Sequence, residues 1–231
     1  MKVDIGIIGA MEEEVSALVG MLEKAKRERV GMIDFYVGNI YKKKVVIAKC
    51  GVGKVFAAVC AEAMILSYSP RLIVNTGVGG ALGAGITTTN VVIADKLCQH
   101  DMDTSAIGDP KGLVSGINKI YFDADPRAIR ILDKAARELS VKTFIGTVAT
   151  GDKFIADPID KARIVSDFSA ICCEMEGGAI AQVAYVNLVP FAVVRAISDS
   201  ADGEATMDFP TFLPIAAKNS TAMTLALIKE Y

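Results

Sequence analysis

The chain has 231 residues, of which 52% are hydrophobic, enough to bury the core of one large domain. Lys and Arg number 25 and Asp and Glu number 27, so the formal net charge of -2 excludes the basic surface typical of a nucleic-acid-binding protein. No apolar run approaches the roughly 18 residues that a membrane-spanning helix needs, which also excludes a membrane protein of that type.

Apolar runs alternate with helical segments through the first half of the chain. The expected elements, in order, are a strand at Val3–Ile8, a helix at Glu12–Lys26, paired strands at Phe35–Ile40 and Lys44–Lys49, a helix at Lys54–Ser67, and strands at Arg71–Thr76 and Asn90–Ala94. The expected strand at Arg71–Thr76 is followed directly by the glycine cluster Gly77–Gly80.

The second half begins with an irregular stretch, Gln99–Phe122, that contains several glycines and a proline. Long loops of this kind are often functional. The elements expected after it are a helix at Pro126–Ser140, a strand at Thr143–Ala149, a helix at Pro158–Asp167, a strand at Ala170–Cys173, a helix at Gly177–Val186, a strand at Pro190–Ile197 and a helix at Pro210–Tyr231.

This alternation predicts an α/β fold, a single domain over residues 1–231 with a central mixed β-sheet flanked by helices. Ligands of such folds bind at the carboxyl ends of strands. Polar residues and glycines gather at those ends, in Gly9–Glu14, Gly51–Lys54, Asn75–Gly80, Thr150–Phe154, Glu174–Glu176 and Arg195–Asp199. Because so many strand ends carry such residues, the sequence predicts one cleft into which several strand ends point.

Cysteines and the N-terminus indicate a soluble, cytoplasmic protein. The five cysteines are odd in number and irregularly spaced, which predicts free and mostly buried thiols rather than disulfides. Asp4 follows Lys2 too closely for a typical signal peptide. His100 is the only histidine; we interpret it as structural or peripheral, and we expect neither a metal nor a cofactor.

Glu12, Glu13 and Glu14 directly follow the first strand. Acidic residues suit the first turn of a helix because they face the positive end of its dipole, so spacing alone does not single out Glu14. The cluster Gly77–Gly80 has two interpretations, a tight turn from strand to helix or a close approach of the backbone to a ligand.

Two acidic patterns are more specific. Glu174 and Glu176, two apart on a predicted extended segment, share one face, and a carboxylate in a cleft suits a vicinal diol such as ribose, although an exposed strand end is the plain alternative. Arg195 interrupts an apolar strand and needs a carboxylate partner. Asp199 ends that strand, where burial would keep it protonated as an acid.

Together these stretches resemble the 5′-methylthioadenosine/S-adenosylhomocysteine nucleosidases of the purine nucleoside phosphorylase superfamily. The matching stretches are Ile5–Val15, Gly51–Val55, Asn75–Gly77, Gly151–Ile155, Glu174–Glu176 and Val194–Asp199. The resemblance implies a homodimer that binds a small nucleoside. It also implies hydrolysis of the N-glycosidic bond of methylthioadenosine, S-adenosylhomocysteine and 5′-deoxyadenosine, as in methionine salvage and the removal of methyl-cycle by-products.

The resemblance also implies roles for single residues. Glu14 would activate the attacking water, and Asp199 would protonate the purine at N7. Glu176 would hold the ribose hydroxyls with Glu174 nearby and Met175 against the sugar, above a turn containing Val78 and Gly79. Phe154 would stack on the purine, and Ile155 would read the purine edge. Arg195 would hold Glu176, and Ser198 would hold Asp199. The apolar part of the site would be lined by Met11, Val52, Ile107 and Phe209.

Some residues depart from the family pattern. Val78 stands where Ser or Ala is common, and Thr104 and Ile107 stand where larger apolar or aromatic residues are common. Three alternatives therefore stay open: a futalosine-type hydrolase, a purine nucleoside phosphorylase and a non-catalytic nucleoside sensor. The acidic run Glu12–Glu14 disfavours the phosphate that a phosphorylase binds, and a sensor has no need of both Glu14 and Asp199.

Overall fold

The structure is a computed structural model that describes the backbone of residues 1–231 and every side chain except that of Met207. The strands are β1 (Ile5–Gly9), β2 (Glu23–Val30), β3 (Ile33–Ile40), β4 (Lys43–Lys49), β5 (Leu72–Ala81), β6 (Val91–Gln99), β7 (Phe122–Asp123), β8 (Thr143–Thr150), β9 (Cys172–Glu174) and β10 (Phe191–Asp199). The helices are α1 (Glu12–Gly20), α2 (Lys54–Tyr68), the short 3₁₀ helix η1 (Ser105–Ile107), α3 (Pro126–Glu138), α4 (Pro158–Phe168), α5 (Gly177–Val186) and α6 (Ala205–Glu230).

All ten strands belong to one mixed sheet, which confirms the predicted α/β class. Part of the sheet closes on itself, because β5 pairs with β10, β10 with β6, β6 with β8, β8 with β9, and β9 again with β5. The strands β1, β4, β3 and β2 extend the sheet outward from β5. This closure brings the carboxyl ends of β5, β8, β9 and β10 together, although they are far apart in the sequence.

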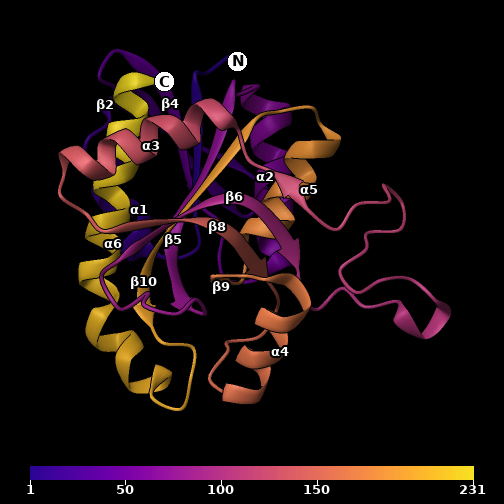
Figure 1. The fold of residues 1–231 in the computed structure, drawn as a ribbon. Helices are drawn as coiled ribbons and strands as arrows, with labels where there is room; N and C mark the ends of the chain where they lie inside the picture. The colour runs from indigo at the N-terminus through magenta and orange to yellow at the C-terminus, as the bar shows by residue number, and fades with distance from the viewer.

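Helices cover the sheet on two sides, as Figure 1 shows. α1 and α3 both contact α6 on one side, and α2 packs against α5 on the other. The central strands are buried on both faces, which explains why β1 is a continuous apolar run and why β5 shows no alternation of buried and exposed residues. All five cysteines are free and buried, as predicted.

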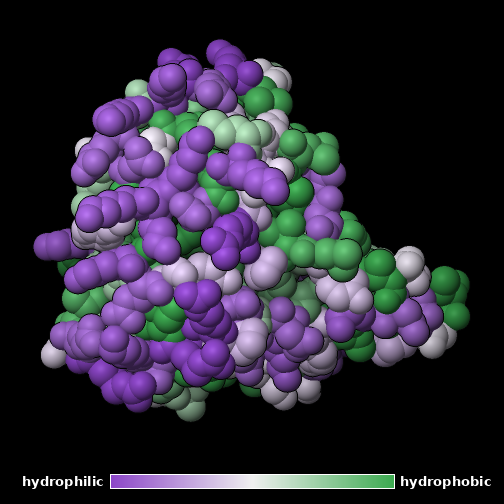
Figure 2. All heavy atoms as spheres, turned by 90° about the horizontal axis from the view of Figure 1, so that it is seen from above, coloured by the Kyte–Doolittle hydropathy of each residue, from purple (hydrophilic) through white to green (hydrophobic). Residues whose placement is uncertain are grey.

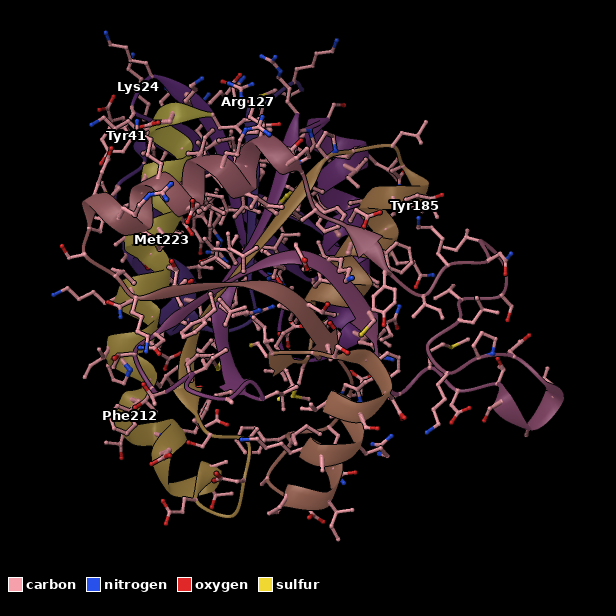
Figure 3. All side chains as sticks on the ribbon, in the orientation of Figure 1. Lys24, Tyr41, Arg127, Tyr185, Phe212 and Met223 are labelled. Atoms are coloured by element: carbon pink, nitrogen blue, oxygen red, sulfur yellow. The ribbon has the colours of Figure 1, made fainter. Side chains whose placement is uncertain are left out.

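The predicted helix Glu12–Lys26 is wrong in its second half. α1 ends at Gly20, and Glu23–Val30 forms β2, which pairs with β3 in antiparallel register. Every residue of β2 is exposed, so the strand lacks the apolar alternation by which strands are recognised. Its Lys, Arg and Glu side chains are typical of an edge strand that avoids pairing with another chain, and Lys24 lies at this outer edge (Figure 3).

Several boundaries also differ from the prediction. Gly77–Gly80 lies within β5, so the cluster is not a turn from strand to helix. β6 continues beyond Ala94 to Gln99 across an irregularity in its register, where Asp95 and Lys96 interrupt the apolar pattern. α6 begins at Ala205, before Pro210 and Pro214, which both lie inside the helix. Glu174 ends β9, so the expected extended segment Glu174–Glu176 is interrupted there.

The stretch between β6 and β7, called the arm from here on (residues 100–121), contains η1 and an isolated bridge between Val114 and Lys119. It projects from the body on the side of α2 and α5 (Figure 1). Ile107, near its tip, is 82% exposed. Among the helices of the described residues, none is long and apolar enough to span a membrane.

Candidate active site

A pocket opens where the carboxyl ends of the strands converge. It contains about 620 Å³ of space, part of it open to solvent, which is within the range of small-molecule sites. It is lined by Ala10, Met11, Glu14, Val52, Val78, Gly79, Gly80, Lys153, Phe154, Ile155, Cys173, Glu174, Met175, Glu176, Ser198, Asp199 and Phe209. The strand ends singled out from the sequence therefore do share one cleft.

Glu14 lies on the first turn of α1 and faces the pocket. One carboxylate oxygen accepts hydrogen bonds from Ala10 N–H at 2.6 Å and Met11 N–H at 3.0 Å, and the other accepts from Val78 N–H at 3.0 Å. Burial raises the pKa of Glu14, although Arg195 and the three N–H groups oppose that rise. The result is a fixed carboxylate whose proton affinity exceeds that of an ordinary glutamate.

Asp199 ends β10 on the same pocket. Ser198 Oγ donates to one carboxylate oxygen at 2.9 Å, and Ala201 N–H donates to the other at 2.9 Å. Ala201 has a left-handed φ of 49°, which turns the chain back so that its N–H reaches Asp199. Burial is the main cause that raises the pKa of Asp199, with Asp208 and Asp202 adding to the rise. Such a group retains its proton at a higher pH than an ordinary aspartate.

Arg195 lies behind the pocket rather than in its lining, and Glu174 is its ion-pair partner. The guanidinium also donates to Asn75 Oδ1, and Asn75 Nδ2 donates to Ile8 O at 2.9 Å. The carboxylate of Glu174 accepts from the N–H groups of Glu176 at 2.9 Å and Gly177 at 2.6 Å, as well as from the Thr150 hydroxyl. Glu174 therefore holds the start of α5 in place and has its oxygens engaged within the protein.

Glu176 is the N-cap residue of α5 and lies next to this ion pair. One of its oxygens accepts from Gly53 N–H at 3.0 Å, and the other lies 3.6 Å from the Arg195 guanidinium. Burial raises the pKa of Glu176 to about 7, against the opposing effect of Arg195. Arg195 therefore does contact Glu176, but it binds Glu174 more closely.

The glycines of β5 allow three charged side chains to approach the strand. A methyl group on Gly77 would lie 2.6 Å from Glu14 Oε1 and would collide with the Arg195 guanidinium. A methyl group on Gly80 would lie 2.8 Å from Asp199 Oδ1. Gly77 and Gly80 thus leave room for the protein's own carboxylates and arginine, whereas a close approach of this backbone to a ligand stays a prediction.

Two aromatic rings border the pocket away from the carboxylates. Phe154 and Phe209 meet edge to face, with ring centroids 5.7 Å apart and an interplanar angle of 85°. Ile155 follows in the same loop and is buried. Lys153 is the cationic side chain among the lining residues, and it is paired with Asp160. An apolar, aromatic half next to an acidic half suits a ligand with a flat ring and a hydroxyl-bearing ring.

The pocket contains every residue expected in the site except Arg195, Thr104 and Ile107. Thr104 and Ile107 lie on the arm, so this chain does not use them to line its own pocket. His100 also lies outside the lining and packs against Gly151. Sequence reasoning missed the lining residues Ala10, Gly80, Lys153 and Cys173 and the supporting residues Asn75 and Thr150; all six are in, or next to, the strand ends that it had identified.

Comparison with known proteins identifies this fold and pocket as those of an N-glycosyl hydrolase of nucleosides within the phosphorylase superfamily. A model of the family described as "Phosphorylase superfamily" matches residues 4–229. The 5′-methylthioadenosine/S-adenosylhomocysteine nucleosidase of Actinobacillus succinogenes is 37% identical over 227 residues, 98% of both chains. The chain belongs to the 5′-methylthioadenosine/S-adenosylhomocysteine nucleosidases.

Solved structures agree with this assignment. The nucleosidase of that name from Neisseria meningitidis, in complex with methylthio-immucillin-A, superposes with a TM-score of 0.96 at 35% identity, covering 99% of each chain. The futalosine hydrolase of Helicobacter pylori superposes with a TM-score of 0.95 at 30% identity, covering 99% of this chain and 98% of its own. The fold is therefore shared with nucleosidases of two substrate types.

Proposed function

We propose that the protein hydrolyses the N-glycosidic bond of 5′-methylthioadenosine, S-adenosylhomocysteine and 5′-deoxyadenosine, and releases adenine. One observation carries this proposal: Glu14 and Asp199 face one pocket, and burial raises the pKa of both. Cleavage of a ribosyl–purine bond needs an acid at the base and a carboxylate that activates water at the sugar, with a transition state like an oxocarbenium ion.

In this mechanism, protonated Asp199 donates its proton to the purine at N7 as the bond between the purine and C1′ breaks. Glu14 accepts a proton from water, whose oxygen forms the new bond to C1′. Adenine and the free sugar leave. The proton gained by Glu14 replaces, through solvent, the one that Asp199 gave, so each cycle consumes one water. The surrounding carboxylates stabilise the positive charge that develops on the sugar.

Glu176 is the group that would bind the ribose hydroxyls. Its carboxylate lines the pocket, whereas the oxygens of Glu174 are engaged by Arg195, Thr150 and two N–H groups. Met175 lines the same part of the pocket and offers the sugar an apolar surface. On the purine side, Phe154 would stack on the ring and the backbone of Ile155 would read its edge. Removal of these by-products would serve methionine salvage.

We also infer a homodimer. α2 exposes Val55, Phe56 and Val59, and α5 exposes Tyr185 and Val186. Figure 2 shows hydrophobic residues on the side from which the arm projects and at the tip of the arm, and Tyr185 lies on this side in Figure 3. Exposed apolar surface of this extent favours a protein partner. In a dimer across this face, Ile107 of the arm would close the partner's pocket beside Val52, where the thio substituent of the substrate would lie.

Futalosine hydrolysis is the second candidate, because the futalosine hydrolase and a nucleosidase of Helicobacter pylori both superpose on this chain with a TM-score of 0.95 at 30% identity. The two activities differ in the group attached to the 5′ carbon. The part of the pocket that would receive this group includes Val52, and Thr104 and Ile107 if the arm closes it in a dimer. Val78 lies on the sugar side, where it offers no hydroxyl.

Adenine release from each nucleoside in phosphate-free buffer tests the proposal, with Asp199→Asn as the inactive control. We expect release from methylthioadenosine and S-adenosylhomocysteine that added phosphate does not accelerate. Strict dependence on phosphate with formation of ribose 1-phosphate would instead identify a phosphorylase. Binding of methylthioadenosine without release of adenine would identify a nucleoside sensor. Release of hypoxanthine from futalosine, without release of adenine from the other nucleosides, would select the second candidate.

A further inference from the structure

α2 begins after a glycine turn in which Gly51 N–H donates to the backbone oxygen of Ala10 at 3.1 Å, whereas the N–H groups of Gly53 and Lys54 are bound by side chains from elsewhere in the chain. Gly51 and Gly53 have φ values of 95° and 102°, and Gly53, the N-cap residue, has no side chain to cap the helix. Instead, Gly53 N–H donates to Glu176 Oε1 at 3.0 Å, and Lys54 N–H donates to Asp152 Oδ1 at 2.8 Å. The position of this turn therefore decides where Glu176 is held.

Asp101, at the base of the arm, accepts hydrogen bonds from both Lys54 and Asp152. Its Oδ1 accepts from Lys54 Nζ at 2.6 Å, and its Oδ2 accepts from Asp152 N–H at 2.9 Å. Because the Asp152 side chain accepts in turn from Lys54 N–H, the three residues form a closed ring of hydrogen bonds. Gln99 Oε1 accepts from the same ammonium at 3.2 Å. We call Asp101, Lys54 and Asp152 the polar ring.

The polar ring lies outside the pocket, yet it is joined to three parts of the pocket lining. Val52 lies in the glycine turn two residues before Lys54, Glu176 accepts from that turn, and Phe154 follows Asp152 by two residues. The Lys54 and Asp101 side chains are 19% and 31% exposed, so their ion pair is partly shielded from water. A methyl group on Gly53 would lie 3.1 Å from Asp152 Oδ1, which shows how closely the ring packs on the turn.

We propose that Asp101 is a positioning residue, which through Lys54 and Asp152 fixes the Gly53 N–H and thereby orients the Glu176 carboxylate toward the ribose hydroxyls. This inference rests on the proposed function. Without Asp101, Lys54 loses its carboxylate partner and Asp152 N–H loses its acceptor. The glycine turn then moves more freely, and Glu176 loses the donor that holds one of its oxygens. Binding of the sugar weakens although no residue of the pocket has changed.

The test compares Asp101→Ala with the wild-type chain on methylthioadenosine and on its analogues lacking the 2′- or the 3′-hydroxyl. We expect kcat/KM on methylthioadenosine to fall about tenfold, mainly through KM, as suits the loss of two hydrogen bonds to a charged group. On the analogue that lacks the hydroxyl bound by Glu176, the loss should shrink to roughly threefold or less, because the two changes remove one interaction. Asp101→Glu should restore part of the lost activity.

Asp133→Ala is the matched control. Asp133 pairs with Arg137 at 2.7 Å and is 33% exposed, but it lies on α3, which contributes nothing to the pocket lining. We expect its kinetic constants to equal those of the wild type. If Asp101→Ala does not fold, Asp101→Asn, which keeps the shape of the side chain, is measured by the same comparison.

An equal loss on methylthioadenosine and on both deoxy analogues would overturn the inference, since the effect would then not pass through the ribose. Unchanged kinetics in Asp101→Ala would overturn it as well. The wild-type chain tests the proposed function separately from the variants. If the wild-type chain releases no adenine from methylthioadenosine, the proposed substrate is wrong, whatever the variants show.

Discussion

The Arg195 guanidinium and the Glu174 carboxylate form an ion pair in which each side chain is only 1% exposed. The pair is supported on both sides, by Asn75 at the guanidinium and by the start of α5 at the carboxylate. Because the oxygens of Glu174 are engaged within the protein, the contribution of the pair to the site is to hold Glu176 next to it. The ribose site therefore depends on an ion pair that the ribose need not contact.

Glu174→Ala should destabilise the protein by about 3–5 kcal/mol, because it leaves the buried Arg195 without its closest carboxylate. The free energy of unfolding, measured by urea denaturation, checks this expectation. Glu138→Ala on the exposed surface of α3 is the control and should change stability little. A Glu174→Ala protein as stable as the wild type would show that Glu176 and Asn75 alone compensate the guanidinium.

Asp199→Asn should lower kcat by about 10² to 10⁴ while the fold persists. The asparagine oxygen can still accept from Ala201 N–H, so the turn after β10 keeps its hydrogen bond. Adenine release measures the activity, and the thermal unfolding midpoint shows whether the fold is intact. Activity within a few-fold of the wild type would be incompatible with Asp199 as the acid.

The dependence of kcat/KM on pH should be bell-shaped. Activity rises as Glu14 loses its proton and falls as Asp199 loses its own, and burial displaces both pKa values upward. Each limb should therefore lie at a higher pH than the ordinary carboxyl values of 4.5 and 3.8. In Asp199→Asn, the residual activity should no longer fall on the alkaline side; a persistent alkaline limb would assign that limb to another group.

Glu176 should make the stability of the free protein depend on pH. Its pKa is raised from 4.5 to about 7 in the folded chain, so the fold favours the protonated form. The corresponding stabilisation is complete below pH 4.5 and is lost as the pH rises through about 7. Glu176→Gln, which cannot ionise, should show a smaller decline in thermal unfolding midpoint over this interval. Glu23→Gln on the exposed strand β2 should decline as the wild type does.

Gly77→Ala should impair both stability and activity. Its methyl group would press on Glu14 Oε1 and on the Arg195 guanidinium, and overpacking of this kind costs about 1–3 kcal/mol. Gly20→Ala is the matched control, because a methyl group there meets nothing within 4 Å. Urea denaturation and adenine release are measured on both variants. Equal behaviour of the two would mean that β5 can shift away from Glu14 without penalty.

The fold class could be predicted because β1, β5 and β10 are apolar runs that end in glycine or polar residues. β2 could not, since its exposed Lys, Arg and Glu residues have the composition of a helix and gain strand structure only by pairing with β3. The closure of the sheet between β5 and β9 rests on two paired positions, Gly80 with Cys173 and Ala81 with Cys172, which no local pattern indicates.

The composition of the pocket was more predictable than the partners of its side chains. Glu14, Glu176 and Asp199 stand at strand ends that spacing brings to one edge of a sheet. That Glu174 would be engaged by Arg195 and Thr150 depends on the geometry of three strands at once. The place of Ile107 stays a prediction for another reason: the arm leaves the body of its own chain, so the surroundings of Ile107 are not set within one chain.

Glu14, Glu174 and Glu176 surround a single guanidinium, that of Arg195. When all three carboxylates are ionised, the free pocket therefore has an excess of negative charge in a region from which water is largely removed. A ligand with a fixed positive charge at the position of the sugar ring would neutralise this excess, whereas its uncharged carbocyclic counterpart would not. The affinity difference between two such ligands would measure how strongly the carboxylates of the free site favour a positive charge at the position of the sugar ring.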